Sequence, residues 1–403
     1  MLEASARDVE LSYTDSDTLV TASATSITLN LITGGFGIGL FSLPWSTAGA
    51  SLIVALLTIV LVVALNGWTV SILIEGAHKH GVYDLGALVG CMGGIPGRIL
   101  QVVVSLAVWV VLYLTQVGYT QVIVDAVDTL TDDFSHTFLV MVVSAVMFPL
   151  CLLNQKYLAF TSQLAVVVNL YILGVTSFED KHPQGACMLG YGPGVISMAA
   201  VMGQAIVVQM CVLPMYRELE DRSPQKFNSI VVRSFSSLAL IFSAFVVMGY
   251  ITYGANVSDN ILHALPMNMW GNSARIAAGV SVACVYPIFA QAMVAPCLNL
   301  PAKLRRIAYL VAIFLTVAVT ALGALFLKSL GMINVLNGSF ASIAFVGLCP
   351  ALVGLCLLDR SSRLWQLGMV FLLVVPTAAG VLGIMFTDNY KDDLTHHCAW
   401  MIQ

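Results

Sequence analysis

One stretch of the chain could present backbone groups, rather than side chains, to a ligand. Residues 34–39 (GGFGIG) hold four glycines in six positions, and Leu43 and Pro44 follow them. Each glycine costs about 1 kcal/mol inside a helix, and a helix broken in lipid must find new partners for its freed backbone groups. Such a break is tolerated where the backbone lines a cavity, and broken membrane helices bind substrates and ions in this way. Close helix packing through small residues is the alternative explanation.

A second interrupted stretch carries two amide side chains. Residues 203–216 (GQAIVVQMCVLPMY) begin with a glycine, contain Gln204 and Gln209, and end in Leu-Pro near an aromatic residue, as the first stretch does. Glutamine is costly inside a membrane and usually has a task there. The two amides therefore either face a ligand opposite the first stretch or make hydrogen bonds between helices.

The composition places both stretches in membrane-spanning helices. Of 403 residues, 59% are hydrophobic and only 9% are charged, whereas soluble domains carry roughly 25% charged residues. We therefore predict an all-α polytopic membrane protein. Spans of about 20 apolar residues give eleven transmembrane helices, at roughly 23–45, 50–74, 99–124, 136–153, 157–177, 194–216, 231–253, 274–298, 307–327, 333–357 and 364–386.

The segments between spans are short, which predicts a single membrane domain. We expect a cytoplasmic acidic tail at 1–22, a transmembrane domain at 23–386 and an extracytoplasmic tail at 387–403. With the N-terminus in the cytoplasm, most of the 17 lysines and arginines fall in cytoplasmic segments, as the positive-inside rule requires. The first and sixth helices then run in opposite directions, so the two interrupted stretches occupy matching positions in inverted halves.

Three residues are expected on the extracytoplasmic side. Asn256 begins a glycosylation sequon, Asn256-Val257-Ser258, in a predicted loop. Cys187 and Cys398 both fall on this side, and an oxidising compartment would permit a disulfide between them. Two free thiols fit the same placement.

Four short motifs, in order along the chain, resemble one known family. Residues 37–44 (GIGLFSLP) look like the first-span pattern of the amino acid/auxin permease family, and residues 213–221 (LPMYRELED) look like the end of its sixth span. Residues 249–254 (GYITYG) match the Gly-Tyr-x-x-aromatic-Gly that closes its seventh span, and residues 334–350 resemble its tenth span. The resemblance covers most of the chain. It implies the inverted five-plus-five (LeuT-like) fold with an added eleventh span, with helices 1 and 6 broken.

The same resemblance implies amino acid transport by alternating access. Breaking the first span would expose N–H groups at the start of a half-helix, where the helix dipole favours a carboxylate. We expect the substrate carboxylate to bind in a cradle, mainly of backbone groups, made by Thr33, Gly34, Gly35, Gly37 and Gly39.

The remaining predicted pocket residues lie on other spans. Gln204, Val207 and Gln209 on span 6 are expected to face the cradle and to help select the substrate side chain. Tyr113 and Tyr119 on span 3 and Tyr286 and Gln291 on span 8 are expected to act as pocket or gate residues, with helix packing or a place in the membrane interface as the alternative role of the tyrosines.

The coupling ion is harder to read from the residues. Asn30, Thr33 and Ser281 offer side-chain oxygens for an ion. The sodium-coupled members of the family often carry an asparagine at the position of Thr33, and its replacement here favours H⁺ over Na⁺, with a Na⁺-coupled symporter as the alternative. We expect no metal site, cofactor or nucleic-acid partner.

Other functions use the same features differently. A membrane receptor that senses amino acids through the same pocket is the main alternative to a transporter. A channel would need charged pore rings, and a membrane enzyme would need paired carboxylates or a nucleophile with its base, and the predicted spans offer neither. The expected partners are a small amino acid and membrane lipid, and the oligomeric state stays open. The sequence is compatible with the plasma membrane and with a vacuolar or lysosomal membrane.

Overall fold

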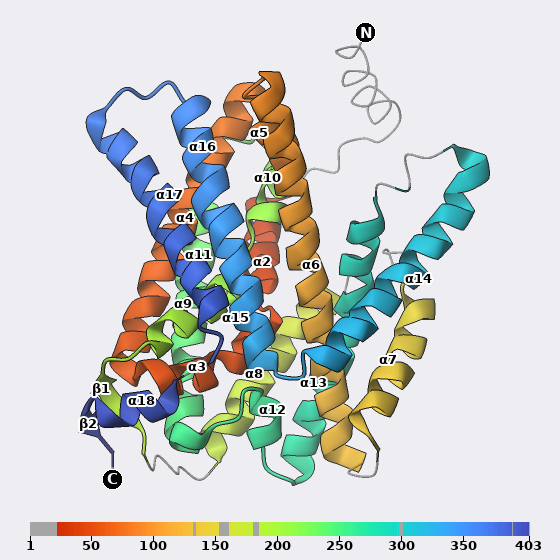
Figure 1. Ribbon diagram of the computed structural model, residues 1–403, viewed down its shortest axis with the longest axis vertical. Coiled ribbons are helices and arrows are strands. Elements are labelled where there is room, and N and C mark those ends of the chain that lie inside the picture. The colour runs from red at the N-terminus through yellow and green to blue at the C-terminus, as the bar shows by residue number, and fades with distance from the viewer. Residues whose placement is uncertain are drawn as a thin grey trace.

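The computed structural model describes residues 22–131, 134–152, 161–179, 185–295, 297, 301–388 and 390–402. The predicted N-terminal tail therefore lies almost entirely outside the described residues. Figure 1 shows a bundle of long helices, with α5 at one end of the bundle and α18 with the two strands at the other.

The described part of the first half of the chain is helical, with long and short helices. In chain order they are α2 (Ala24–Gly35), η1 (Ile38–Ser42), α3 (Leu43–Ala50), α4 (Leu52–His80), α5 (Leu85–Gly90), α6 (Gly94–Thr131), α7 (His136–Leu150) and α8 (Thr161–Phe178).

The second half contains the remaining helices and two short strands. In chain order they are β1 (Cys187–Gly190), α9 (Gly194–Ala205), α10 (Gln209–Glu218), α11 (Pro224–Tyr253), η3 (Gly254–Asn256), α12 (Ile261–Ala264), α13 (Met269–Val294), α14 (Ala302–Phe326), α15 (Leu330–Ala341), η5 (Ser342–Leu348), α16 (Cys349–Cys356), α17 (Arg363–Met385), α18 (Lys391–His396) and β2 (Cys398–Met401).

Most of these helices are apolar enough to cross a membrane. Among the described residues, eight spans are long and apolar enough, counting α9 with α10 and α15 with α16 as single spans. The bent pair formed by α2 and η1–α3 makes a ninth, and α7 and the 164–178 part of α8 are shorter apolar helices. The predicted membrane protein with many spans is thus observed, whereas the count of eleven remains a prediction.

The glycine-rich stretch interrupts the first of these spans. Helix α2 ends at Gly35, and η1 begins at Ile38 after Gly37, whose backbone is extended (φ −74°, ψ 172°). The two parts of the span are bent by 43°. Pro44 stands in the first turn of α3, a position at which proline's missing N–H costs no helical hydrogen bond.

Two further helices are irregular at mid-span. Helix α9 ends at Ala205, and α10 begins at Gln209 after three non-helical residues. Between α15 and α16, the residues of η5 form a π-helical segment, a wider helix that often occurs at functional positions. Helix α15 packs against α9, and a Cβ added to Gly203 of α9 would lie 3.0 Å from Ser342 Oγ at the start of η5.

The two ends of the bundle carry different structures. We call the end with α5 and the start of α2 the α5 face, and the end with α12, α18 and the strands the α12 face (Figure 1). On the α12 face, β1 and β2 form a two-stranded antiparallel sheet. A disulfide joins Cys187 to Cys398 there. Of the two alternatives that the sequence left open, a disulfide and two free thiols, the structure has the disulfide. Asn256 is exposed on this face beside Lys391, whose Nζ donates to the Asn256 Oδ1 (3.3 Å).

On the α5 face, the start of α2 is attached to the end of α10. Ala22 N donates to Glu218 O (2.8 Å), and Glu220 N donates to Ala22 O (3.1 Å), which forms a parallel bridge between Ala22 and Leu219. The entry to the first broken span and the exit of α10 are therefore joined by backbone hydrogen bonds. Glu75 pairs with Arg360 nearby (2.7 Å), so this carboxylate has a cationic partner.

Candidate functional site

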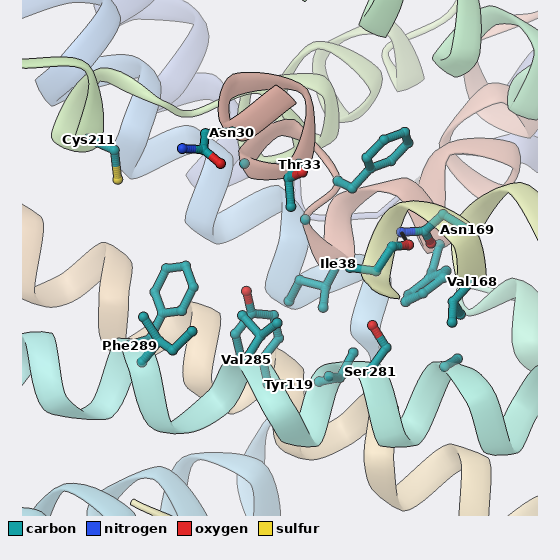
Figure 2. Close-up of a pocket in the computed structure, with 18 of the residues that line it drawn as sticks. Asn30, Thr33, Ile38, Tyr119, Val168, Asn169, Cys211, Ser281, Val285 and Phe289 are labelled. Atoms are coloured by element: carbon teal, nitrogen blue, oxygen red, sulfur yellow. Dashed lines mark hydrogen bonds between the residues drawn. The ribbon is translucent and has the colours of Figure 1, made fainter. Parts of the chain in front are cut away.

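A cavity of about 370 Å³ lies beside the break between α2 and η1. Its volume falls in the range of small-molecule sites. Figure 2 shows that its lining side chains come from several helices that surround the break. The lining residues are Asn30, Thr33, Gly34, Phe36, Gly37, Ile38, Phe41, Tyr119, Ala165, Val168, Asn169, Cys211, Met215, Ala278, Ser281, Val282, Val285, Ile288 and Phe289.

The cavity has an accessible end and a closed end. Asn30 and Gly34, on the part of α2 that leads to the α5 face, are exposed. Phe41, Asn169 and Ser281 are each less than a tenth exposed. In Figure 2, Asn30 and Asn169 lie at opposite ends of the group of side chains. The cavity thus extends from the break toward the α5 face.

Most of the predicted cradle residues on α2 reach this cavity. Thr33, Gly34 and Gly37 line it, and the Thr33 hydroxyl donates to Leu29 O one turn earlier (2.8 Å), which leaves its oxygen able to accept. Gly35 lies on another face of α2, since a Cβ there would meet the Leu238 side chain of α11 at 2.5 Å.

The glycines of the first break touch the second break directly. A Cβ added to Gly39 would lie 2.9 Å from Ala205 N and 3.0 Å from Ala205 Cα, so only glycine permits this approach. A Cβ on Gly37 would lie 3.9 Å from Gln204 O, and one on Gly34 would lie 3.8 Å from Val208 Cγ1. The two interrupted helices therefore meet at their interruptions.

The amides of the second break point away from the cavity. Gln209 Nε2 donates to Asn66 Oδ1 of α4 (2.7 Å), and Gln209 Oε1 accepts from Val208 N (3.1 Å). When the Asn337 amide is oriented to match its neighbours, its oxygen accepts from Gln204 Nε2 (3.0 Å). Both glutamines thus make the interhelical hydrogen bonds that were the alternative to ligand contact.

Val207, like these two glutamines, is outside the lining of the cavity, and it is half-buried against the core. From the second broken helix, Cys211 and Met215 line the cavity instead. These two residues follow the break on α10 and lie one turn apart. Both side chains are uncharged, a thioether in Met215 and a protonated thiol in Cys211.

The tyrosines divide between the cavity and the helix contacts. Tyr119 of α6 lines the cavity and meets the Phe289 ring edge-to-face, with 5.4 Å between centroids. Tyr113, one and a half turns earlier, reaches α14, where its hydroxyl lies 3.5 Å from Val319 O. Tyr286 is fully buried in the contact between α13 and α6, where Gln116 Nε2 donates to its carbonyl oxygen (3.0 Å).

The predicted ion ligands lie around the same cavity. Asn30, Thr33 and Ser281 all line it, and Ser281 is at its closed end on α13. The sequence analysis did not single out Asn169 of α8, which also lines it. In the sequence, the feature that could have identified Asn169 is its amide in the middle of an apolar run, residues 164–174 (LAVVVNLYILG).

On the side of the α12 face, the segment that connects α11 to α13 lies against the end of η1. Ser42 Oγ at the end of η1 donates to Asp259 O (2.7 Å), and Ser329 Oγ before α15 donates to the Asp259 carboxylate (2.6 Å). Asn334 Nδ2 of α15 donates to Ser42 Oγ (2.9 Å). These hydrogen bonds hold this segment against the first broken span.

The same segment is attached to α6 through a second carboxylate. Asn260 Nδ2 and His263 Nε2 lie 2.7 and 3.3 Å from Asp125 Oδ2. The pKa of His263 is raised above its ordinary value, chiefly by its hydrogen bond to Asp125; burial opposes this, and the charges of Asp125, Asp259 and Asp128 reinforce it. A raised pKa in the folded protein means that protonated His263 stabilises this attachment.

Comparison with known proteins places the chain in a family. A family model described as "Transmembrane amino acid transporter protein" matches residues 20–387. The chain belongs to this family. The predicted membership of the amino acid/auxin permease family is thereby confirmed, and the members of the family are transporters rather than enzymes.

Individual transporters are similar over nearly the whole chain. "Putative sodium-coupled neutral amino acid transporter 11" of Danio rerio is 22% identical over 97% of this chain and 92% of its own length. Among solved structures, the manganese transporter of Eremococcus coleocola has a TM-score of 0.54, with 15% identity over 92% of this chain and 87% of that chain. MhsT in complex with L-phenylalanine has a TM-score of 0.53, with 12% identity over 89% and 97%. These neighbours have the LeuT-like fold, and the likeness extends to the fold alone.

Proposed function

We propose that this protein is a secondary active transporter that moves neutral amino acids across a membrane by alternating access. In this proposal the chain has eleven spans, the first ten form two inverted halves, and the breaks at residues 36–37 and 206–208 are those of helices 1 and 6. Transport of amino acids follows from the family, and the neutral substrate is supported by the name of the Danio rerio relative.

One observation carries the proposal: the two interrupted helices meet beside a cavity of amino acid size. Gly39 packs on the backbone of Ala205, and Gly37 lines the cavity between them. An anchoring helix gains nothing from either break, whereas a transporter needs backbone groups that a substrate can reach at mid-span.

The cavity suits both ends of a neutral amino acid. Gly37 precedes η1 and no side chain caps the helix there, and the helical segment continues through α3 to Ala50. Its positive dipole end would attract the carboxylate. Among the described lining residues there is no lysine, arginine, aspartate or glutamate, so the substrate side chain meets apolar groups such as Phe41 and Val285.

The hydrogen bonds on the α12 side define which gate is closed. The segment carrying Asp259 is hydrogen-bonded to Ser42 at the end of η1, while Asn30 and Gly34 are exposed at the other end of the cavity. The arrangement fits a state that exchanges substrate through the α5 face. With the predicted topology, this face is cytoplasmic. Opening the cavity to the other side of the membrane would require the hydrogen bond between Ser42 and Asp259 to break.

Two coupling ions have support from different residues. Proton coupling, which the sequence favours, would use the titratable pair Asp125 and His263, because the described lining of the cavity holds no carboxylate or histidine. Sodium coupling is the second candidate, since Asn30, Thr33 and Ser281 bring side-chain oxygens to one cavity and the Danio rerio relative is named sodium-coupled.

Uptake into proteoliposomes tests the function and the ion together. Purified protein would be supplied with a mixture of the twenty amino acids under a pH gradient and, separately, under a Na⁺ gradient. We expect accumulation of neutral amino acids under one of the two gradients. Saturable binding without accumulation under either gradient would refute the transporter and support the amino-acid-sensing receptor.

The substitution Gly37→Leu tests the cavity as the site. Only Gln204 O lies within 4 Å of a Cβ at this position, so a leucine side chain would extend into the cavity and should abolish uptake at normal expression. Gly174→Leu on α8 is the matched control, because nothing lies within 4 Å of a Cβ there and the residue is outside the cavity. Normal uptake by Gly37→Leu would place the substrate elsewhere.

A further inference from the structure

Helix α8 places Asn169, which has an unpaired amide oxygen, at the closed end of the cavity. Asn169 is 6% exposed and lines the cavity. Its Nδ2 donates to Ala165 O one turn earlier (2.9 Å), whereas its Oδ1 is buried without a hydrogen-bond partner. Rotating the amide by half a turn would place Oδ1 against Ala165 O, two acceptors in contact, so the orientation that leaves Oδ1 unpaired is the favoured one.

A buried acceptor without a donor is unfavourable, and in native proteins such an atom calls for an explanation. Near Asn169 the lining of the cavity is mainly apolar, with Val168, Phe41 and Val282. In Figure 2, Asn169 and Ser281 lie on one side of the cavity, away from Asn30 at the accessible end. The missing donor is therefore supplied by whatever occupies the cavity.

The donor can be identified from the two charged groups of the substrate, its carboxylate and its α-ammonium group. The carboxylate has its expected place at the start of η1, beside Gly37. The α-ammonium group of the same molecule then needs acceptors, and it carries three N–H donors and a positive charge. A charge-assisted hydrogen bond to a buried oxygen is stronger than a neutral one. An amide oxygen fixed at the closed end of the cavity meets this need without adding a titratable group.

We propose that Asn169 Oδ1 accepts a hydrogen bond from the α-ammonium group of the substrate, and that it selects amino acids over acids that lack this group. The inference rests on the proposed transport of amino acids. It assigns a recognition role to α8, a helix outside both interrupted spans. A bound Na⁺ is the other cation that could meet this oxygen, and the experiment separates the two.

Two substitutions of Asn169 distinguish a substrate contact from a structural amide. Asn169→Leu keeps the approximate size and removes the acceptor, whereas Asn169→Asp keeps an acceptor and adds negative charge. Each variant would be reconstituted in proteoliposomes. Uptake of the best neutral amino acid would be measured with increasing amounts of its 2-hydroxy acid analogue, which has the same side chain but no ammonium group.

We expect Asn169→Leu to raise the half-saturation concentration of the amino acid about 10- to 100-fold, with a smaller loss of inhibition by the 2-hydroxy acid, whose hydroxyl group can give the oxygen only a neutral hydrogen bond. Asn169→Asp should retain affinity for the amino acid and lose affinity for the 2-hydroxy acid, because two like charges would then share the cavity. If Asn169→Leu does not fold, the Asn169→Asp result decides alone. Equal effects on both compounds in the folded variants would overturn the proposal.

Asn228→Leu is the matched control. Asn228 of α11 also has a buried Oδ1 without a partner, but it lines a surface groove between α4 and α11 instead of the cavity. Its half-saturation concentration should equal that of the unaltered protein.

The Na⁺ dependence of uptake would be measured for the same variants. If Asn169→Leu changed the half-saturation concentration for Na⁺ and left the preference for the amino acid over the 2-hydroxy acid intact, the oxygen would be an ion ligand and the proposal would be wrong. Absence of uptake by the unaltered protein would instead refute the proposed transport function. The failure of the Asn169 proposal and the failure of the proposed function therefore give different results.

Discussion

Replacing Gly39 with alanine should weaken the contact between the two interrupted helices. The added Cβ would lie 2.9 Å from Ala205 N and 3.0 Å from Ala205 Cα. Ordinary contacts between such atoms lie at about 3.5–4.0 Å, so the two breaks must separate by roughly half an ångström. Ala205 N and Cα are backbone atoms, which cannot move aside as the end of a side chain can.

The cost of this overlap exceeds what alanine gains. Overpacking of this kind costs about 1–3 kcal/mol, while exchanging glycine for alanine in a helix gains at most about 1 kcal/mol. We therefore expect Gly39→Ala to lower the free energy of unfolding. Gly37→Ala is the matched control, because its Cβ would lie 3.9 Å from Gln204 O, an ordinary contact.

The thermal unfolding midpoint of each variant, purified in detergent, measures the difference. Gly39→Ala should unfold at a lower temperature than both the unaltered protein and Gly37→Ala. Equal midpoints for the two variants would show that the breaks do not pack on one another as the structure places them, and the argument from the Gly39 contact would fail.

Two further predictions concern the neighbours of the breaks. Gln209→Leu removes the partner of the buried Asn66 amide and should destabilise the protein by about 1–3 kcal/mol. The unfolding midpoint should be lower, and the half-saturation concentration for substrate should be unchanged. A changed half-saturation concentration at full stability would contradict this prediction. The raised pKa of His263 beside Asp125 gives stability that is complete below the ordinary histidine pKa of about 6.5 and is lost as the pH rises through the raised value. The unfolding midpoint should therefore decrease as the pH rises above about 6.5, and His263→Gln should flatten this dependence; identical pH profiles would refute the attachment.

The sequence was sufficient to locate the cavity because the decisive chemistry belongs to the backbone. A run of glycines in an apolar span predicts a helix break, and this prediction does not depend on where the other helices lie. Gly34 and Gly37 indeed line the cavity. Thr33 and Asn30 were found for the same reason, since they precede the break by less than two turns. The second break followed from the match between the two stretches.

The direction of individual side chains could not be predicted in the same way. A membrane helix is apolar on nearly all sides, so it lacks the periodic pattern that marks the inner face of a soluble helix. Gln209 looked like a pocket residue, but its partner Asn66 lies 143 residues earlier. Asn169 was visible as a polar residue in an apolar run, and only the packing of α8 shows that the residue lines the cavity and that its amide oxygen has no partner.

The disulfide on the α12 face has a consequence for biosynthesis. Its two cysteines are separated by 211 residues, and every helix from α9 to α17 lies between them. The bond can close only after the translocation machinery has inserted all of these helices with the correct orientation, because one misplaced span would leave the thiols on opposite sides of the bilayer. A nonreducing gel of newly made protein would thus record the moment at which the whole second half of the chain is assembled.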